Sequence, residues 1–299
     1  MRRTLAVIPA CILILSGCLF AEIEESPSPV KELTAAERAP LETLTATRDD
    51  NMGLGNPSDA TADVSNPDNF LINRPQYALS FNNSRGSANW VSWHLSTAWK
   101  GSAPRSTSFI ADTSLPAGFV KVFSSWYTNT GFDRGHLCPS EDRDGSTTDN
   151  QATFILTNIV PQAPVNNQQT WRALEDYGRT LINAGNELYI VAGPAGVGGT
   201  GSAGSADTIH SGDVTVPAFM WKVIVVLPVG SNDVNRVSTS TRVIAVNMPN
   251  DQDVNAHTWD FYRVSVDSLE AMTGFDFLSN VPTSVQSVIE ASVDNGPVK

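Results

Sequence analysis

The residues of this chain best suited to chemistry form the run Asp133-Arg134-Gly135-His136. Side chains two residues apart on an extended strand project to the same face, so Arg134 and His136 can approach one substrate atom. Gly135 lies between them, and we expect its missing side chain to leave room for a close approach. A guanidinium can hold a phosphate, and an imidazole can take a proton from water near neutral pH. The run therefore suggests hydrolysis of a phosphodiester.

The helices and strands that must position this run do not alternate regularly along the sequence. The longest predicted helix spans residues 168–184 and ends at Gly185; shorter ones are expected at 266–273 and 281–293. Segments rich in aromatic and β-branched residues predict strands at 89–96, 154–160, 187–192, 221–227, 242–246 and 262–266. This order predicts an α+β domain with a mixed or antiparallel central sheet and flanking helices.

Three segments together resemble a known family: DRGHLCPSEDR (133–143), TNIVPQ (157–162) and NNQQTWRALEDYGR (166–179). They resemble the DNA/RNA non-specific endonucleases of the ββα-metal, or His-Me finger, superfamily, and most strongly the secreted, sugar-non-specific bacterial nucleases. The likeness extends from about Gly55 to Val281. It implies that a ββα-metal finger forms the active site of an endonuclease that cuts DNA and RNA and leaves 5′-phosphate ends.

Phosphodiester hydrolysis needs an activated water, neutralisation of the phosphate oxygens and help for the leaving oxygen. His136 suits the role of general base on chemical grounds, and the resemblance implies the same role. A divalent metal can perform the other two tasks. The resemblance implies Asn167 as its direct ligand, selected by spacing over the chemically identical Asn166; a helix N-cap is the alternative role for Asn167. One neutral oxygen ligand suits Mg²⁺, with Mn²⁺ as the alternative.

The remaining candidate site residues are an acid and three arginines. Glu175 follows Asn167 by eight residues, about 12 Å along a helix, so we expect it to act on the metal through water, as the resemblance implies. Arg179 lies one helical turn after Glu175 and is assigned to catalysis, with an ordinary ion pair to Glu175 as the alternative. Arg105 aligns with the arginine that binds the scissile phosphate in the family. Arg134 is a second phosphate-facing candidate, and its alternative is to brace the finger.

Two other patterns are interpreted as unrelated to the site. Residues 199–204 match G-x-G-x-x-G, but no helical pattern follows them, so we expect a surface loop rather than a dinucleotide site. His136 and Cys138 are potential zinc ligands without a nearby second pair, which argues against structural zinc. The other histidines, His94, His210 and His257, are expected to be packed or surface residues.

The N-terminus has the pattern of an export signal. Arg2 and Arg3 precede a short apolar run that ends in Leu15-Ser16-Gly17-Cys18, which resembles the lipobox of bacterial lipoproteins. We therefore expect residues 1–18 to be a lipoprotein-type signal and Cys18 to carry a lipid that binds the membrane. This predicts an extracytoplasmic protein anchored at the cell surface or outer membrane; an ordinary secreted protein is the alternative.

Charge and composition then divide the mature chain. Residues 19–50 contain eight acids against three bases and few large apolar residues, so they predict a flexible acidic tether before a nuclease domain at 51–299. The whole chain carries −12, so its long-range field repels nucleic acid, and DNA or RNA must be captured locally. Only Cys138 of the three cysteines remains in the domain, which excludes an internal disulfide framework.

Two alternatives to the endonuclease follow from the same residues. One is a non-catalytic surface lipoprotein that retains a nuclease-derived fold, although every expected catalytic position is filled. The other is a metal phosphodiesterase that acts on small substrates. The resemblance also allows a dedicated protein inhibitor as a partner.

Overall fold

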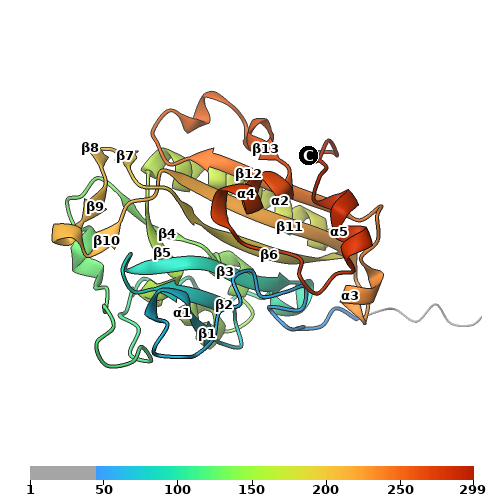
Figure 1. Cartoon of the computed structure of the whole chain (residues 1–299), viewed down its shortest axis with the longest axis horizontal. Coiled ribbons are helices and arrows are strands. Elements are labelled where there is room, and N and C mark those ends of the chain that lie inside the picture. Colours follow the sequence, from blue (N-terminus) through green and yellow to red (C-terminus); the bar gives the residue numbers. More distant parts are fainter. Residues whose placement is uncertain (1–44) are drawn as a thin grey trace, which may run out of the picture. The chain divides into compact units, whose positions relative to one another are not determined.

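The computed structural model describes residues 45–299, and its central feature is a seven-stranded antiparallel sheet (Figure 1). Its strand order is β1-β2-β3-β6-β11-β12-β13. The strands are β1 (Phe70–Asn73), β2 (Ala78–Asn82), β3 (Ser87–Leu95), β6 (Asn186–Ala195), β11 (Phe219–Pro228), β12 (Arg242–Pro249) and β13 (Arg263–Val264). Every neighbouring pair is antiparallel.

Five α-helices accompany the sheet in the described part of the chain. They are α1 (Thr147–Ala152), α2 (Arg172–Asn183), α3 (Asp233–Arg236), α4 (Val266–Thr273) and α5 (Thr283–Ile289). A π-helical turn, Asn166–Trp171, leads directly into α2, so the predicted long helix is confirmed. Gly185 follows the last turn with a φ of 90°, a left-handed conformation that favours glycine at a helix C-terminus.

The sheet is covered on both faces. Along β11, Met220 and Ile224 belong to the core beneath α2, whereas Val223 and Val225 belong to the core beneath α4 and α5. Because side chains alternate between faces, a strand buried on both sides is apolar at nearly every position. This explains the run WKVIVVL and makes its one charged residue, Lys222, unusual.

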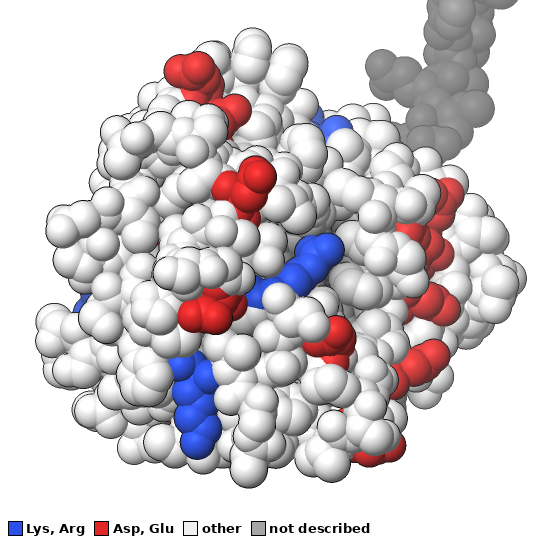
Figure 2. All heavy atoms as spheres, turned by 60° about the vertical axis from the view of Figure 1, so that its left-hand side comes forward, with Lys and Arg blue, Asp and Glu red and all other residues white. Residues whose placement is uncertain are grey.

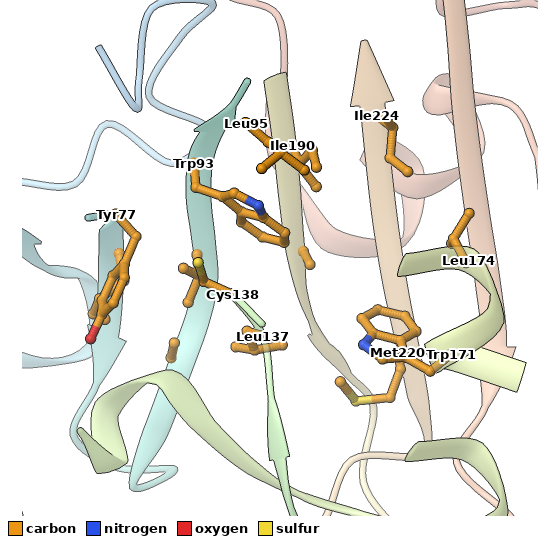
Figure 3. Close-up of a cluster of buried hydrophobic side chains, with 14 of the residues drawn as sticks. Tyr77, Trp93, Leu95, Leu137, Cys138, Trp171, Leu174, Ile190, Met220 and Ile224 are labelled. Carbon is orange, nitrogen blue, oxygen red and sulfur yellow. The ribbon is translucent and has the colours of Figure 1, made fainter. Parts of the chain in front are cut away.

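The first core joins the sheet to α2 and to the segment that follows β4 (Figure 3). Trp171 and Leu174 reach the sheet from the helix side, and Leu137 and Cys138 reach it from the other segment. Each of these four side chains is at most 1% exposed. The core therefore fixes both segments that carry candidate site residues onto one rigid support.

The described residues form three further sheets, each of two strands, outside the central one. They are β4 (Asp133–His136) with β5 (Ile159–Gln162), β7 (Gly199–Gly201) with β8 (Gly204–Ala206), and β9 (Thr208–Ile209) with β10 (Val214–Thr215). The glycine-rich motif is thus the β7–β8 hairpin and does not open a helix. This agrees with its interpretation as unrelated to a dinucleotide site.

The α+β prediction is confirmed, with errors at particular elements. The predicted strand at 154–160 is wrong over most of its length, because β5 begins only at Ile159. Before it, Asn158 folds the chain locally: its side chain accepts a hydrogen bond from Cys138 N at 2.9 Å and donates one to Thr153 O at 2.8 Å. The strand predicted at 262–266 is reduced to two residues, and the helix predicted at 281–293 shortens to α5.

The predicted signal and most of the predicted tether lie outside the described residues. The last part of that tether, 45–50, packs on the domain instead of leaving it: Arg48 pairs with Asp149 at 3.1 Å, and Asp49 N donates to His94 Nδ1 at 3.3 Å. The folded domain therefore begins before residue 51. Within residues 45–299, no helix combines the length and the apolarity that a membrane span needs.

Candidate active site

A cleft of about 510 Å³ brings most of the candidate residues together. It is lined by Arg105, His136, Pro139, Ser140, Glu141, Asn167, Gln168, Gln169, Arg172, Glu175 and Arg179. Every candidate site residue within the described chain except Arg134 is among them. On the face of the molecule shown in Figure 2, basic side chains are scattered and form no broad basic area.

A ββα finger positions these residues. His136 ends β4, which pairs with β5 so that Gly135 lies opposite Val160. The chain then turns into the helix that carries Asn167, Glu175 and Arg179. The expected role of Gly135 is corrected: a Cβ there would lie 2.1 Å from Gln162 Oε1, so the glycine makes room for a side chain of β5 rather than for substrate.

His136 is buried, and its imidazole is uncharged. Its ring is 8% exposed and meets the edge of Phe154 at a centroid distance of 4.7 Å. Its Nε2 is buried and has no hydrogen-bond partner among the described residues. Burial, followed by the positive charge of Arg105, lowers the pKa of His136 to about 3. The imidazole is therefore unprotonated at neutral pH, as a general base must be.

The two adjacent asparagines have different surroundings. Asn166 is fully buried, accepting a hydrogen bond from Gln162 Nε2 at 2.7 Å and donating one to Pro249 O at 2.6 Å. Asn167 lines the cleft, and its Nδ2 donates to Asp133 Oδ2 at 2.8 Å. Because the amide nitrogen is engaged, the carbonyl oxygen of Asn167 is the atom left for a ligand.

The N-cap alternative does not describe Asn167. The helix begins one residue earlier, at Asn166, and Asn167 N already donates a helix-type hydrogen bond to Ala163 O at 2.9 Å. Asn167 lies in a widened π-helical turn, an irregularity found often at functional sites.

Glu175 faces a buried lysine. Its Oε1 lies 3.6 Å from Lys222 Nζ, and that ammonium also sits 4.1 Å from the ring centre of Trp171. Burial raises the pKa of Glu175 to about 7, although Lys222 acts to lower it. Burial in turn lowers the pKa of Lys222. Glu175 is thus a mostly buried carboxyl whose pKa depends on nearby positive charge. A cation bound in the cleft would lower this pKa and favour the ionised form.

Arg179 pairs with acids other than Glu175. Its guanidinium contacts Asp142 at 2.9 Å, Asp176 at 2.5 Å and Glu141 at 3.1 Å. Burial acts to lower the pKa of Arg179, but Asp142 and Glu175 together raise it, so the charge is permanent. The alternative role for Arg179, an ordinary ion pair with Glu175, is therefore not what the structure shows. Other acids hold the guanidinium in place at the wall of the cleft.

The other two arginines differ in position. Arg105 is exposed, donates to Ser140 Oγ and lies 5.1 Å from the ring centre of Phe154, beside His136. Arg134 lies outside the cleft, 5.0 Å from the ring centre of Phe109, and donates to Ser124 O at 3.4 Å. This position favours the bracing alternative for Arg134 over contact with phosphate.

The remaining histidines do not line the cleft. His94 is fully buried, with Nε2 3.5 Å from Glu187 Oε2. His210 stacks on Trp126, and His257 stacks on Phe261.

Two residues of the site escaped the sequence analysis. Lys222 arrives from β11, and Asp142 accepts from Trp93 Nε1 at 3.0 Å while it holds Arg179. The available signal for Lys222 was its position as the one charge inside an apolar strand. Asp142 lies within the DRGHLCPSEDR segment and had no separate signal.

The donors in the cleft fit a small, oxygen-preferring cation. The carbonyl of Asn167 and the carboxylate of Glu175 both line it, and Glu141 adds a further carboxylate. Hard divalent cations take carbonyl, carboxylate and water oxygens. Because His136 is neutral, it does not oppose such a positive charge beside Glu175.

Comparison with known proteins identifies the family. The family model for DNA/RNA non-specific endonucleases matches residues 56–284. The chain belongs to this family. This DNA/RNA non-specific endonuclease is 46% identical over 288 residues to a nuclease of Nostoc sp., covering 96% of this chain and 97% of that protein.

More distant relatives share part of the chain. The mitochondrial nuclease EXOG of Xenopus laevis is 32% identical over 210 residues, which are 67% of this endonuclease and 56% of EXOG. A chain in the crystal structure of the EndoG/EndoGI complex matches with a TM-score of 0.64 at 24% identity, covering 78% of this chain and 91% of that chain. The latter match supports the fold.

Proposed function

We propose that this nuclease hydrolyses internal phosphodiester bonds of DNA and RNA with His136 as the general base and one Mg²⁺ held by Asn167. The single observation that carries the proposal is the cleft itself, which a neutral His136 and the oriented carbonyl of Asn167 share with Glu175. The products would end in 5′-phosphates.

His136 acts on water. Because its imidazole is neutral, it can accept the proton of a water molecule that attacks phosphorus. The rings of Phe154 and Phe109 pack against the imidazole at centroid distances of 4.7 and 5.5 Å and so restrict its orientation. A fixed base needs no reorganisation when the water loses its proton.

The arginines bind the substrate's negative charge. Arg105 lies on an exposed loop and can turn from Ser140 to a phosphate oxygen. Arg179 is anchored by Asp142, so it offers a cation of fixed position. Since the pentacovalent state carries more charge on its oxygens than the substrate does, a guanidinium held in place, as that of Arg179 is, favours the transition state.

Asn167 is proposed to hold the cation directly, with Glu175 accepting hydrogen bonds from the water around it. When bound, Mg²⁺ would neutralise charge on the phosphate oxygens and on the leaving 3′ oxygen. Mn²⁺ is the alternative cation. Asp133 contributes by holding the amide nitrogen of Asn167, which leaves the carbonyl oxygen for the ion.

The cleft favours phosphate recognition over base recognition. Its charged lining consists of Arg105, Arg172 and Arg179 with two carboxylates, and no phenylalanine, tyrosine or tryptophan of the described residues lines it as a platform for a base. Contacts to phosphate carry no base or sugar information, so such a cleft acts on both DNA and RNA.

The proposal is tested by the products of plasmid and RNA digestion. We expect cleavage that requires Mg²⁺ or Mn²⁺, stops with EDTA, and yields ends that ligase rejoins without prior treatment by a kinase. Ends that need a kinase before ligation would contradict the proposed geometry of attack. Faster turnover of a dinucleotide than of a polymer would favour the small-substrate phosphodiesterase.

We further propose that the nuclease acts outside the cytoplasm, anchored through a lipid on Cys18. The support is the Leu15-Ser16-Gly17-Cys18 motif and the acidic segment after it. We expect the protein to fractionate with membranes, and Cys18→Ser to release it or leave its signal uncleaved. Equal amounts of soluble protein with and without Cys18 would favour simple secretion. A protein inhibitor remains a prediction from the family resemblance.

A further inference from the structure

Three carboxylates converge on the face of the sheet opposite the cleft. Asp267 and Glu270 belong to α4, and Glu290 follows the last turn of α5. One carboxylate oxygen from each lies within 4.8 Å of the other two. The backbone joins the same elements, because Asp267 N donates to Glu290 O at 3.1 Å.

Within residues 45–299, no positively charged side chain pairs with this cluster. None of its three acids forms an ion pair with a lysine, arginine or histidine of residues 45–299. In the described part of the chain, these three side chains make one hydrogen bond, which Glu270 Oε1 accepts from Phe277 N at 3.0 Å. Like charges this close repel strongly unless a cation or a proton separates them.

Glu290 is the member that most needs a partner. The residue is 5% exposed, and its Oε1 is buried without a hydrogen-bond partner in the described chain. Burial, followed by the negative charges of Glu270, Asp276 and Asp267, raises the pKa of Glu290 to about 7. A buried carboxylate oxygen that lacks a donor is an uncommon and costly feature.

We propose that Asp267, Glu270 and Glu290 form a Ca²⁺ site that is separate from the nuclease cleft and clamps α4 to the end of α5. The donor set consists only of oxygens, which Ca²⁺ takes in numbers of six to eight, with water supplying the rest. Three oxygens within 4.8 Å of one another can all lie about 2.8 Å or less from one central ion, so small side-chain adjustments would bring them to the usual Ca²⁺ bond lengths. Asp267 is exposed, which gives the ion a route from solvent.

The expected role is structural. α4 and α5 cover the second core through Leu269 and Ile289 and contribute nothing to the lining of the cleft. Bound Ca²⁺ would therefore raise thermal stability without taking part in hydrolysis. Mg²⁺ demands a tighter octahedral geometry and keeps more water, so it should bind this cluster less well.

The test is thermal unfolding of the full-length protein, stripped of metal with a chelator and titrated with Ca²⁺. At Ca²⁺ about 100 times its Kd we expect the Tm to rise by about 5 °C or more. The same rise is expected in Asn167→Ala, which removes the proposed ligand of the cation in the nuclease cleft. It is also expected in Asp253→Asn, which removes an exposed acid outside the cluster. Glu290→Gln should lose the rise and be more stable than wild type without Ca²⁺, because it removes an unpaired buried charge.

Isothermal titration calorimetry with Ca²⁺ gives the second measurement. Asn167→Ala should retain one Ca²⁺ site, and the double variant with Glu290→Gln should retain none. A Tm rise of equal size in Glu290→Gln, or no Ca²⁺-dependent rise in wild type, would overturn the site. An equal rise with Mg²⁺ in place of Ca²⁺ would overturn its assignment to calcium.

Discussion

Asn167 donates a hydrogen bond from Nδ2 to Oδ2 of Asp133 at 2.8 Å, and this bond connects the first strand of the finger to its helix. Gln168 Nε2 donates to the same oxygen, also at 2.8 Å. The carboxylate thereby determines which way the Asn167 amide points. The motif residue Asp133 is thus a positioning residue for the proposed metal ligand.

Replacing Asp133 should weaken Mg²⁺ binding more than it lowers the rate of cleavage at saturating Mg²⁺. In Asp133→Ala, the Asn167 amide is free to rotate, and loss of such a supporting contact typically costs about 10- to 100-fold in metal affinity. We expect a matching rise in the Mg²⁺ concentration for half-maximal cleavage, with most of the rate recovered at saturation. Gln168→Ala leaves the Asn167 bond intact and serves as the control. An unchanged Mg²⁺ requirement in Asp133→Ala would show that Asp133 does not position the ligand.

The acid side of the pH–activity profile should report Glu175. Its pKa is about 7 and that of His136 is about 3, so as pH falls it is Glu175 that first takes a proton and loses its charge. Activity should therefore fall below about pH 7, and more Mg²⁺ should move this fall to lower pH because the cation favours the ionised acid. Glu175→Gln should be weakly active with no such fall. If the fall persists in Glu175→Gln, another group controls it.

Lys222 should influence this titration from the sheet. It lies 3.6 Å from Glu175 Oε1, and its charge favours the ionised carboxylate. In Lys222→Met, the acid limb should move to higher pH by about one unit, since an opposite charge at this range shifts a carboxyl by that order. Lys121→Met, which removes an exposed lysine, should leave the profile unchanged. Coincident profiles for Lys222→Met and wild type would exclude the coupling.

Gly135 should be required for stability of the finger. A Cβ there would lie 2.1 Å from Gln162 Oε1 and 2.6 Å from Gln162 Cβ. We expect Gly135→Ala to lower the free energy of unfolding by about 1–3 kcal/mol, the usual cost of overpacking. Gly178→Ala, within α2, is the matched control. Its new Cβ would contact only Leu188 of β6, at the ordinary distance of 3.5 Å. Chemical denaturation of both variants checks this, and equal stabilities would contradict it.

The finger was predictable because its residues are close in sequence. The Asp133–His136 strand and the 166–179 helix each carry a dense motif, and the hydrophobic pattern placed most of the central strands correctly. The edge strands β1 and β2 were missed because they are short and hold one β-branched residue, Ile72, between them.

What the sequence could not show were contacts between distant segments. Spacing put Arg134 on the same face as His136, but it could not show that Phe109 would cover that guanidinium. Nor could it show that Lys222, far along the chain, would reach Glu175. Such contacts depend on how the sheet and the finger pack, which no local pattern records.

The most direct test of the central claim is the rate of plasmid cleavage by His136→Ala at saturating Mg²⁺, with folding verified by thermal unfolding. If His136 is the general base, the rate should fall about 10²- to 10⁴-fold. His257→Ala, which alters a histidine stacked on Phe261 outside the cleft, should cut at the wild-type rate. A folded His136→Ala protein that cuts as fast as wild type would contradict the assignment.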